Sequence, residues 1–137
     1  MAGITSTAVL YDLAKKLNLK IQYIGFAEDL HNQKLKKGIY IINLGDLVRG
    51  GSHWTLLYIG KRSAFYSDSY AMPPEDGVIK FVSSMPFDWN KDFQLQGVDE
   101  NYCGEWSLLT ARHLKYGSSS LKKRFEDFAK KFNNLKS

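Results

Sequence analysis

"HWTLLYIGKRSAFYSDSY", residues 53–70, reads as two β-strands joined by a short turn. Both halves are rich in β-branched and aromatic residues, and Gly60 and Lys61 between them are typical turn residues. The pattern therefore predicts a hairpin, and "GIYIINL" at 38–44 predicts a neighbouring strand. In such a hairpin His53 stands at the mouth of one strand and Asp68 ends the other, so we expect their side chains to lie next to each other.

Four other stretches have apolar residues at helical spacing. The first has Ser6 or Thr5 available as its N-cap, and the third has Gly117 as a natural stop. The second follows two prolines, which favours a helix that starts after Pro74. The predicted helices are 6–18, the segment after Pro74, Cys103 to about Tyr116, and the stretch from Leu121 that carries Phe125, Phe128 and Phe132.

The remaining segments are a loop-rich stretch after the first helix and "DFQLQGV" at 92–98, which predicts a short strand. No internal repeat or linker divides the chain, so we expect a single domain over residues 1–137. The predicted fold class is α+β, with a mixed central β-sheet flanked by helices. Cys103 would then lie at the N-terminus of a buried helix.

The composition narrows the class of protein. The chain has 137 residues, of which 44% are hydrophobic, and this balance is typical of one globular domain. Its N-terminal stretch has no basic region, and no segment approaches the roughly 18 apolar residues of a membrane span. The one cysteine cannot form an intrachain disulfide or build a multi-cysteine zinc site. We therefore expect a soluble intracellular protein with no metal and no cofactor.

Cys103 itself stands where a helix begins, and the partial positive charge of a helix N-terminus favours a reactive thiolate. An imidazole is the other usual partner of such a thiol. His113 lies ten residues along the same predicted helix, about 15 Å away, and His31 lies in a polar loop. His53 is the better candidate base, and Asp68 would orient it as the acid of a triad. The alternative is that His53 is a strand-edge residue and Asp68 a turn residue.

Three segments in this order, "GGSHWTLLYIG", "FYSDSYAMPP" and "QGVDENYCGEW", resemble the adenovirus-type and Ulp-like cysteine proteases. The likeness is greatest to the short virus-encoded members that mature the capsids of large DNA viruses and virophages. It covers roughly residues 38–115. The family has its histidine followed by tryptophan, its acid in a strand-ending Asp-Ser step, and its cysteine followed by glycine. A glutamine stands about seven residues before that cysteine.

The resemblance implies an adenain-like fold and a role for each matching residue. His53, Asp68 and Cys103 would form the catalytic triad, and Gln96 would supply part of the oxyanion hole. Trp54 and Gly104 would contact the substrate, with Trp54 as the roof of a narrow channel that excludes side chains near the scissile bond. By resemblance the substrates are viral capsid precursor proteins cut after small residues, often at Gly-Gly sites, in the host cytoplasm or in the virion.

Two alternatives stay open. The same residues would serve a deconjugating peptidase that acts on a ubiquitin-like modifier. From a different class, the net charge of +5 and the lysine-rich C-terminal helix fit a nucleic-acid-binding module in which Cys103 is a core residue. Non-specific DNA contact through that helix is also compatible with a protease, although lysines between apolar positions are typical of any solvated amphipathic helix.

Overall fold

The hairpin predicted over residues 53–70 is present in the computed structural model, which describes residues 6–44, 53–91, 93–95, 102–117 and 119–136, the side chains of 132–136 excepted. Its strands are β3 (Trp54–Ile59) and β4 (Ala64–Ser67). Gly60 N donates to the Ser63 carbonyl at 2.8 Å and closes the turn. The predicted turn is therefore confirmed, and Asp68 directly follows the second strand.

Five strands form one sheet in the order β1-β2-β3-β4-β5. The additional strands are β1 (Ile21–Phe26), β2 (Gly38–Asn43) and β5 (Phe87–Trp89). The β2-β3 and β3-β4 pairs are antiparallel, whereas the two edge strands β1 and β5 pair in parallel with β2 and β4. The sheet is therefore mixed, with the hairpin near its centre.

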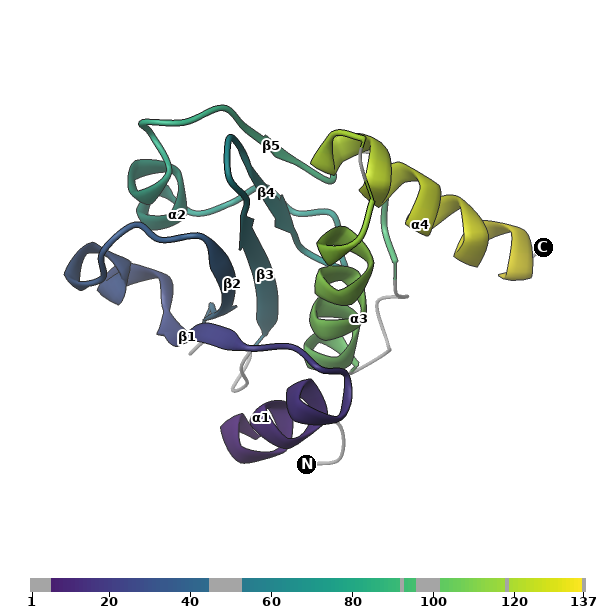
Figure 1. Cartoon of the computed structure of the whole chain (residues 1–137), viewed down its shortest axis with the longest axis horizontal. Helices are drawn as coiled ribbons and strands as arrows, with labels where there is room; N and C mark the ends of the chain where they lie inside the picture. Colours follow the sequence, from purple (N-terminus) through teal and green to yellow (C-terminus); the bar gives the residue numbers. More distant parts are fainter. Residues whose placement is uncertain (1–5, 45–52, 92, 96–101, 118, 137) are drawn as a thin grey trace.

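Helices cover both faces of the sheet (Figure 1). One face packs against α1 (Thr7–Lys16), α3 (Cys103–Lys115) and α4 (Leu121–Lys136), and α3 runs beside β3. The other face packs against the short 3-10 helix η1 (Ala27–Asn32) and α2 (Asp76–Phe81). Because both faces are covered, the central strands are apolar along most of their length.

Alternation along β3 divides its side chains between the two cores. Trp54 and Leu56 join the core under α3, whereas Leu57 and Ile59 join the core under α2. The same alternation operates in β4, where Phe65 faces the first core and Tyr66 the second. The register of the hairpin therefore fixes which face each side chain beyond its strands can reach.

The predicted helix ends agree well with the structure. The Ser6 hydroxyl accepts from Val9 N at 3.2 Å and caps α1, and Gly117 adopts φ +126° two residues after α3 ends. Cys103 is the first residue of α3 and is buried. The α+β class, the mixed sheet flanked by helices and the position of Cys103 are thus confirmed. Within the described residues, no helix is long and apolar enough to cross a membrane.

Two parts of the prediction were wrong. The stretch after α1, predicted as loop-rich, contains β1 and η1. Its strand is an edge strand with one partner and mixed burial, so its sequence has no clear alternation. The strand predicted over 92–98 is absent at the described residues 93–95, where Leu95 N makes a backbone hydrogen bond to the Ser69 carbonyl at 2.8 Å. The rest of that predicted strand lies outside the described residues.

Candidate active site

The hairpin register brings His53 and Asp68 together. Leu56 pairs with Ser67 in the last rung of the β3-β4 hairpin, so His53 and Asp68 both lie just beyond this end of the hairpin. His53 Nε2 lies 2.7 Å from Asp68 Oδ1. Sequence spacing predicted this neighbourhood, and its physical cause is the antiparallel pairing of β3 with β4, which brings the start of one strand next to the end of the other.

Asp68 is 1% exposed, so its carboxylate has almost no contact with water. A buried carboxylate is costly unless hydrogen bonds and an opposite charge compensate for lost hydration. Its Oδ1 accepts from Tyr70 N at 2.8 Å in addition to meeting the His53 ring. The carboxylate is therefore held in one orientation by a backbone donor and directed at the imidazole.

Cys103 is far from His53 and Asp68 in the sequence, but its side chain lies at the same site. Its thiol lies at the first residue of α3, where the helix has no side-chain cap, and Trp54 N donates to Sγ at 3.3 Å. The Ser107 hydroxyl donates to the Cys103 carbonyl at 2.8 Å and fixes the first turn of α3. A backbone N–H and the helix N-terminus both favour negative charge on the sulfur.

His53 is hydrogen-bonded to the side chains of both Asp68 and Cys103. Burial would lower the pKa of the imidazole, but these two hydrogen bonds and the two negative charges raise the pKa to about 9. Asp68 engages the Nε2 nitrogen of the ring. The His53 side chain is 18% exposed, so one edge of the ring remains accessible. The imidazole of His53 thus lies between the Asp68 carboxyl group and the Cys103 thiol, and both groups interact with it.

The side chain of Tyr70 packs on the imidazole of His53. Its ring lies against the His53 ring, with centroids 4.8 Å apart and planes tilted by 30°. The turn that carries Tyr70 is closed by Ala71 N, which donates to the Asp68 carbonyl at 2.7 Å, and Ala71 adopts a left-handed φ of 58°. A non-glycine residue in this region is unusual and costs energy, so the surrounding contacts must hold the turn in place.

Sequence reasoning missed Tyr70 and Asn90. Asn90 is 1% exposed and contacts Asp68 through two hydrogen bonds, with Asp68 N donating to Oδ1 at 3.0 Å and Nδ2 donating to the Asp68 carbonyl at 2.6 Å. No local pattern marks either residue, because Tyr70 follows an ordinary strand end and Asn90 an ordinary short strand. A buried asparagine becomes informative only once its partners are known.

The other predicted site residues are either buried or outside the described residues. Trp54 is 4% exposed and its side chain packs in the core under α3, and Gly104 is buried in the first turn of that helix. Their contact with substrate stays a prediction. Gln96 lies outside the described residues, so its predicted oxyanion role also stays a prediction.

The remaining two histidines lie outside the trio, as predicted. His113 is near the end of α3 and stacks on Phe128, with ring centroids 5.1 Å apart. Burial and the nearby Lys131 lower its pKa. The His31 ring nitrogen Nδ1 lies 2.7 Å from the Glu28 carbonyl within η1. Both rings therefore have local structural contacts of their own.

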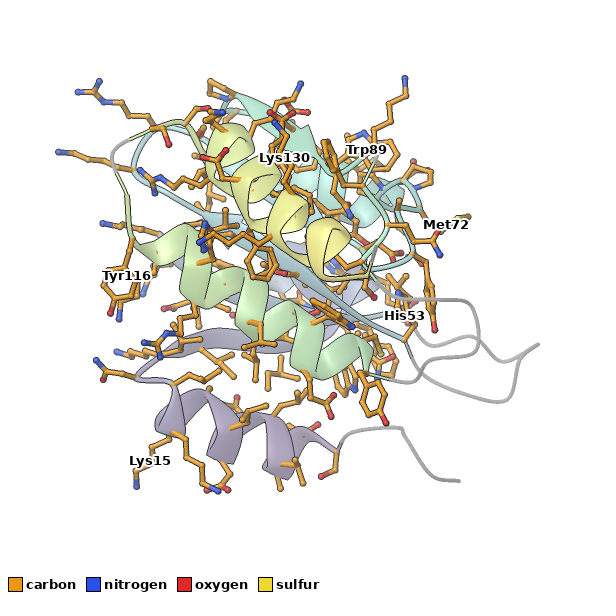
Figure 2. All side chains as sticks on the ribbon, turned by 90° about the vertical axis from the view of Figure 1, so that its right-hand side faces the viewer. Lys15, His53, Met72, Trp89, Tyr116 and Lys130 are labelled. Atoms are coloured by element: carbon orange, nitrogen blue, oxygen red, sulfur yellow. The ribbon has the colours of Figure 1, made fainter. Side chains whose placement is uncertain are left out.

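No metal site accompanies the trio: the described part of the chain holds no group of three or more His, Cys, Asp or Glu side chains that could bind a metal ion. A cavity of about 510 Å³ lies between α1, the start of β1 and the end of α3, and Lys15, Lys20 and Lys115 line it. Cys103 and Lys115 are at opposite ends of α3, so this cavity is separate from the trio. Figure 2 likewise shows His53 at the end of α3 opposite Tyr116.

The basic helix α4 carries exposed lysines, as its pattern predicted. Lys123 Nζ pairs with Asp127 at 3.1 Å and Lys122 Nζ with Asp88 at 3.7 Å. Both pairs are largely exposed, so each contributes little to stability. These carboxylates also reduce the positive charge that the helix presents, which weakens the argument for a dedicated nucleic-acid surface.

Comparison with known proteins adds no assignment. No model of a known protein family matches the sequence, and no curated protein matches it. The chemistry of the site therefore rests on the geometry of His53, Asp68 and Cys103.

Proposed function

We propose that this protein is a cysteine endopeptidase with Cys103 as nucleophile, His53 as acid and base, and Asp68 as the orienting acid. One observation supports this assignment above the others: His53 lies 2.7 Å from a buried carboxylate and also interacts with the side chain of Cys103, a thiol at a helix start. A core cysteine needs neither the imidazole nor the carboxylate, whereas an activated thiol uses both.

In the first half of the reaction the Cys103 thiolate attacks the carbonyl carbon of the scissile peptide bond, and a C–S bond forms. The carbonyl oxygen takes the negative charge. His53, protonated because its pKa is about 9, gives its proton to the leaving amine as the C–N bond breaks. Asp68 keeps the ring oriented and stabilises its positive charge throughout.

In the second half, water attacks the thioester carbon. The neutral His53 ring takes a proton from that water, the C–S bond breaks, and the carboxylic acid product leaves the thiolate behind. The backbone N–H of Cys103, with Gln96 as the expected side-chain donor, would stabilise the oxyanion in both halves.

The substrate class follows from the resemblance to adenovirus-type and Ulp-like proteases. We infer capsid precursor proteins cut after small residues as the first choice, in a host cell or a virion. A deconjugating peptidase for a ubiquitin-like modifier would use the same trio. A cleavage assay that offers both kinds of substrate separates the two.

Thiol labelling tests the chemistry without knowledge of the substrate. The protein is incubated with iodoacetamide over a range of pH, and the modified residue is mapped by mass spectrometry. We expect rapid labelling of Cys103 that extends well below the ordinary thiol pKa of about 8.5 and slows at least about tenfold in His53→Ala. His31→Ala is the matched control and should label like the wild type. Labelling that follows an ordinary thiol titration in all three proteins would refute the proposal.

A further inference from the structure

Asn90 lies where the sheet ends, directly after β5. The parallel pairing of β4 with β5 runs from Ala64 with Phe87 to Tyr66 with Trp89, and Asn90 N then donates to the Tyr66 carbonyl at 3.2 Å. Among the described residues, no strand continues beyond this point on that side of Asp68. Beside Asp68, the side-chain amide of Asn90 takes the place of the backbone of a neighbouring strand.

The amide of Asn90 has both its donor and its acceptor engaged. Its Oδ1 accepts from Asp68 N at 3.0 Å, and its Nδ2 donates to the carbonyls of Asp68 and Phe93 at 2.6 and 2.9 Å. An amide that bonds the N–H and the C=O of one residue imitates a neighbouring strand. The backbone of Asp68 is thereby held on both sides of its Cα, which fixes the direction of the carboxylate.

The same side chain connects Asp68 to the segment that leads towards Cys103. Phe93 belongs to the short described stretch 93–95, and Leu95 N donates to the Ser69 carbonyl at 2.8 Å. Asn90 and this backbone bond hold the two segments against each other. A change at Asn90 would therefore act first on the end of β4 and on the residue that faces His53.

We propose that Asn90 is a positioning residue of the active site, which acts through Asp68 and touches neither the thiol nor the substrate. This inference rests on the proposed function, because it assigns Asn90 a role in the Cys103, His53 and Asp68 trio. Asn90 holds the Asp68 carboxylate towards the imidazole, and the imidazole in turn supports the thiolate.

A purely structural role would also make Asn90 variants less stable, so stability does not separate the two roles. The proton affinity of His53 does separate them, because only a positioning role changes it. Among the described residues, the groups that face this ring are the Asp68 carboxylate, the Cys103 thiol and the Tyr70 ring. If Asp68 turns away, His53 loses one of its two hydrogen bonds while it stays buried, and its pKa must fall.

The test compares Asn90→Ala and Asn90→Ser with Thr110→Ala as the matched control. Thr110 is fully buried and its hydroxyl donates to the Trp106 carbonyl at 2.7 Å, so its removal also deletes a buried hydrogen bond, but one within α3 and away from Asp68. The His53 ring is titrated by NMR in each protein, with its signal assigned from its loss in His53→Gln. Urea unfolding gives the stability of each variant.

We expect the His53 pKa to fall by about one unit or more in both Asn90 variants and to stay unchanged in Thr110→Ala. The rate of Cys103 labelling by iodoacetamide near neutral pH should fall about tenfold or more in the Asn90 variants alone. An unchanged titration and labelling rate in a folded Asn90 variant would overturn the positioning role. So would the failure of both Asn90 variants to fold while Thr110→Ala folds.

Labelling of the wild-type protein distinguishes a failure of this inference from a failure of the proposed function. If wild-type Cys103 labels as an ordinary thiol, the peptidase proposal has failed, whatever Asn90 does. If wild-type Cys103 labels rapidly and depends on His53, but the Asn90 variants match it, only the inference about Asn90 has failed.

Discussion

The backbone N–H of Trp54 donates a hydrogen bond to Sγ of Cys103 at 3.3 Å, across 49 positions of the sequence. This bond joins the first residue of β3 to the first residue of α3. Its donor belongs to the residue after His53, so one short segment supplies both the proposed base and a hydrogen bond to the sulfur. The contact comes from the backbone, and substitution of the Trp54 side chain leaves that N–H in place.

Cys103→Ala should abolish peptidase activity and leave the protein folded. The change deletes one buried sulfur, which costs less than about 2 kcal/mol of unfolding free energy at a single core site. Circular dichroism and urea unfolding check the fold, and cleavage of capsid precursors or modifier conjugates checks activity. Full turnover by the folded variant would end the cysteine peptidase proposal.

Among the three histidines only His53 should matter for turnover. His53→Ala removes the proton carrier and should lower kcat by about 10² or more, whereas His31→Ala and His113→Ala should stay within about threefold of wild type. The reason is that the described contacts of His31 and His113 are local ones, with Glu28 and Phe128. Loss of activity in either of those variants, with His53→Ala active, would mean that the triad is misassigned.

The unfolding free energy should decrease as pH rises from about 6.5 to about 9. The folded-state pKa of His53 is raised to about 9 from an ordinary value of 6.5, so the folded protein binds this proton more tightly than the unfolded chain does. The resulting stabilisation is fully present below pH 6.5 and is lost as pH passes through 9.

Asp68→Asn supplies the comparison for this pH dependence. The amide loses the negative charge that raises the His53 pKa, so the variant should show a smaller decrease over the same window. Urea unfolding at about pH 6, 7.5 and 9.5 gives the slopes. Identical slopes in the wild type, Asp68→Asn and His53→Gln would show that this ion pair does not couple to folding.

Gln96→Ala should lower kcat by about 10² to 10³ with little change in KM, which is the usual effect of losing one oxyanion donor. Gln94→Ala should change kcat by less than about tenfold. Gln94 is exposed beside the buried Leu95, and it offers a matched glutamine two residues away. Equal small effects in steady-state kinetics would remove Gln96 from the site, and a large effect at Gln94 alone would exchange their roles.

Any contact of α4 with DNA should be electrostatic. The double change of Lys130 and Lys131 to Glu removes two exposed lysines and should weaken binding of a duplex by about tenfold or more at low salt. Fluorescence anisotropy at increasing salt measures this, with Lys16→Glu on α1 as the control. Binding that does not weaken as salt rises would contradict an electrostatic contact.

The sequence by itself determined the local elements of this protein. Strand and helix periodicities, a turn at Gly60 and Lys61, and the helix start at Cys103 are properties of neighbouring residues, and each could be read without knowing what lies across the fold. The predicted hairpin also brought His53 and Asp68 together as a candidate pair, and the resemblance to adenovirus-type and Ulp-like proteases added Cys103 to them.

Tertiary structure alone decided the rest. The parallel edge strands β1 and β5 have partners that a local pattern does not specify, so β1 was predicted as loop and a strand was predicted beyond β5. Three sets of contacts depend on how α3 and the sheet edge pack. They are the hydrogen bond from Trp54 N to Cys103, the contact of the Tyr70 ring with His53, and the hydrogen bonds of the Asn90 amide. Such contacts are fixed by the burial of whole faces, and the single residues that make them carry no sign of it in the sequence.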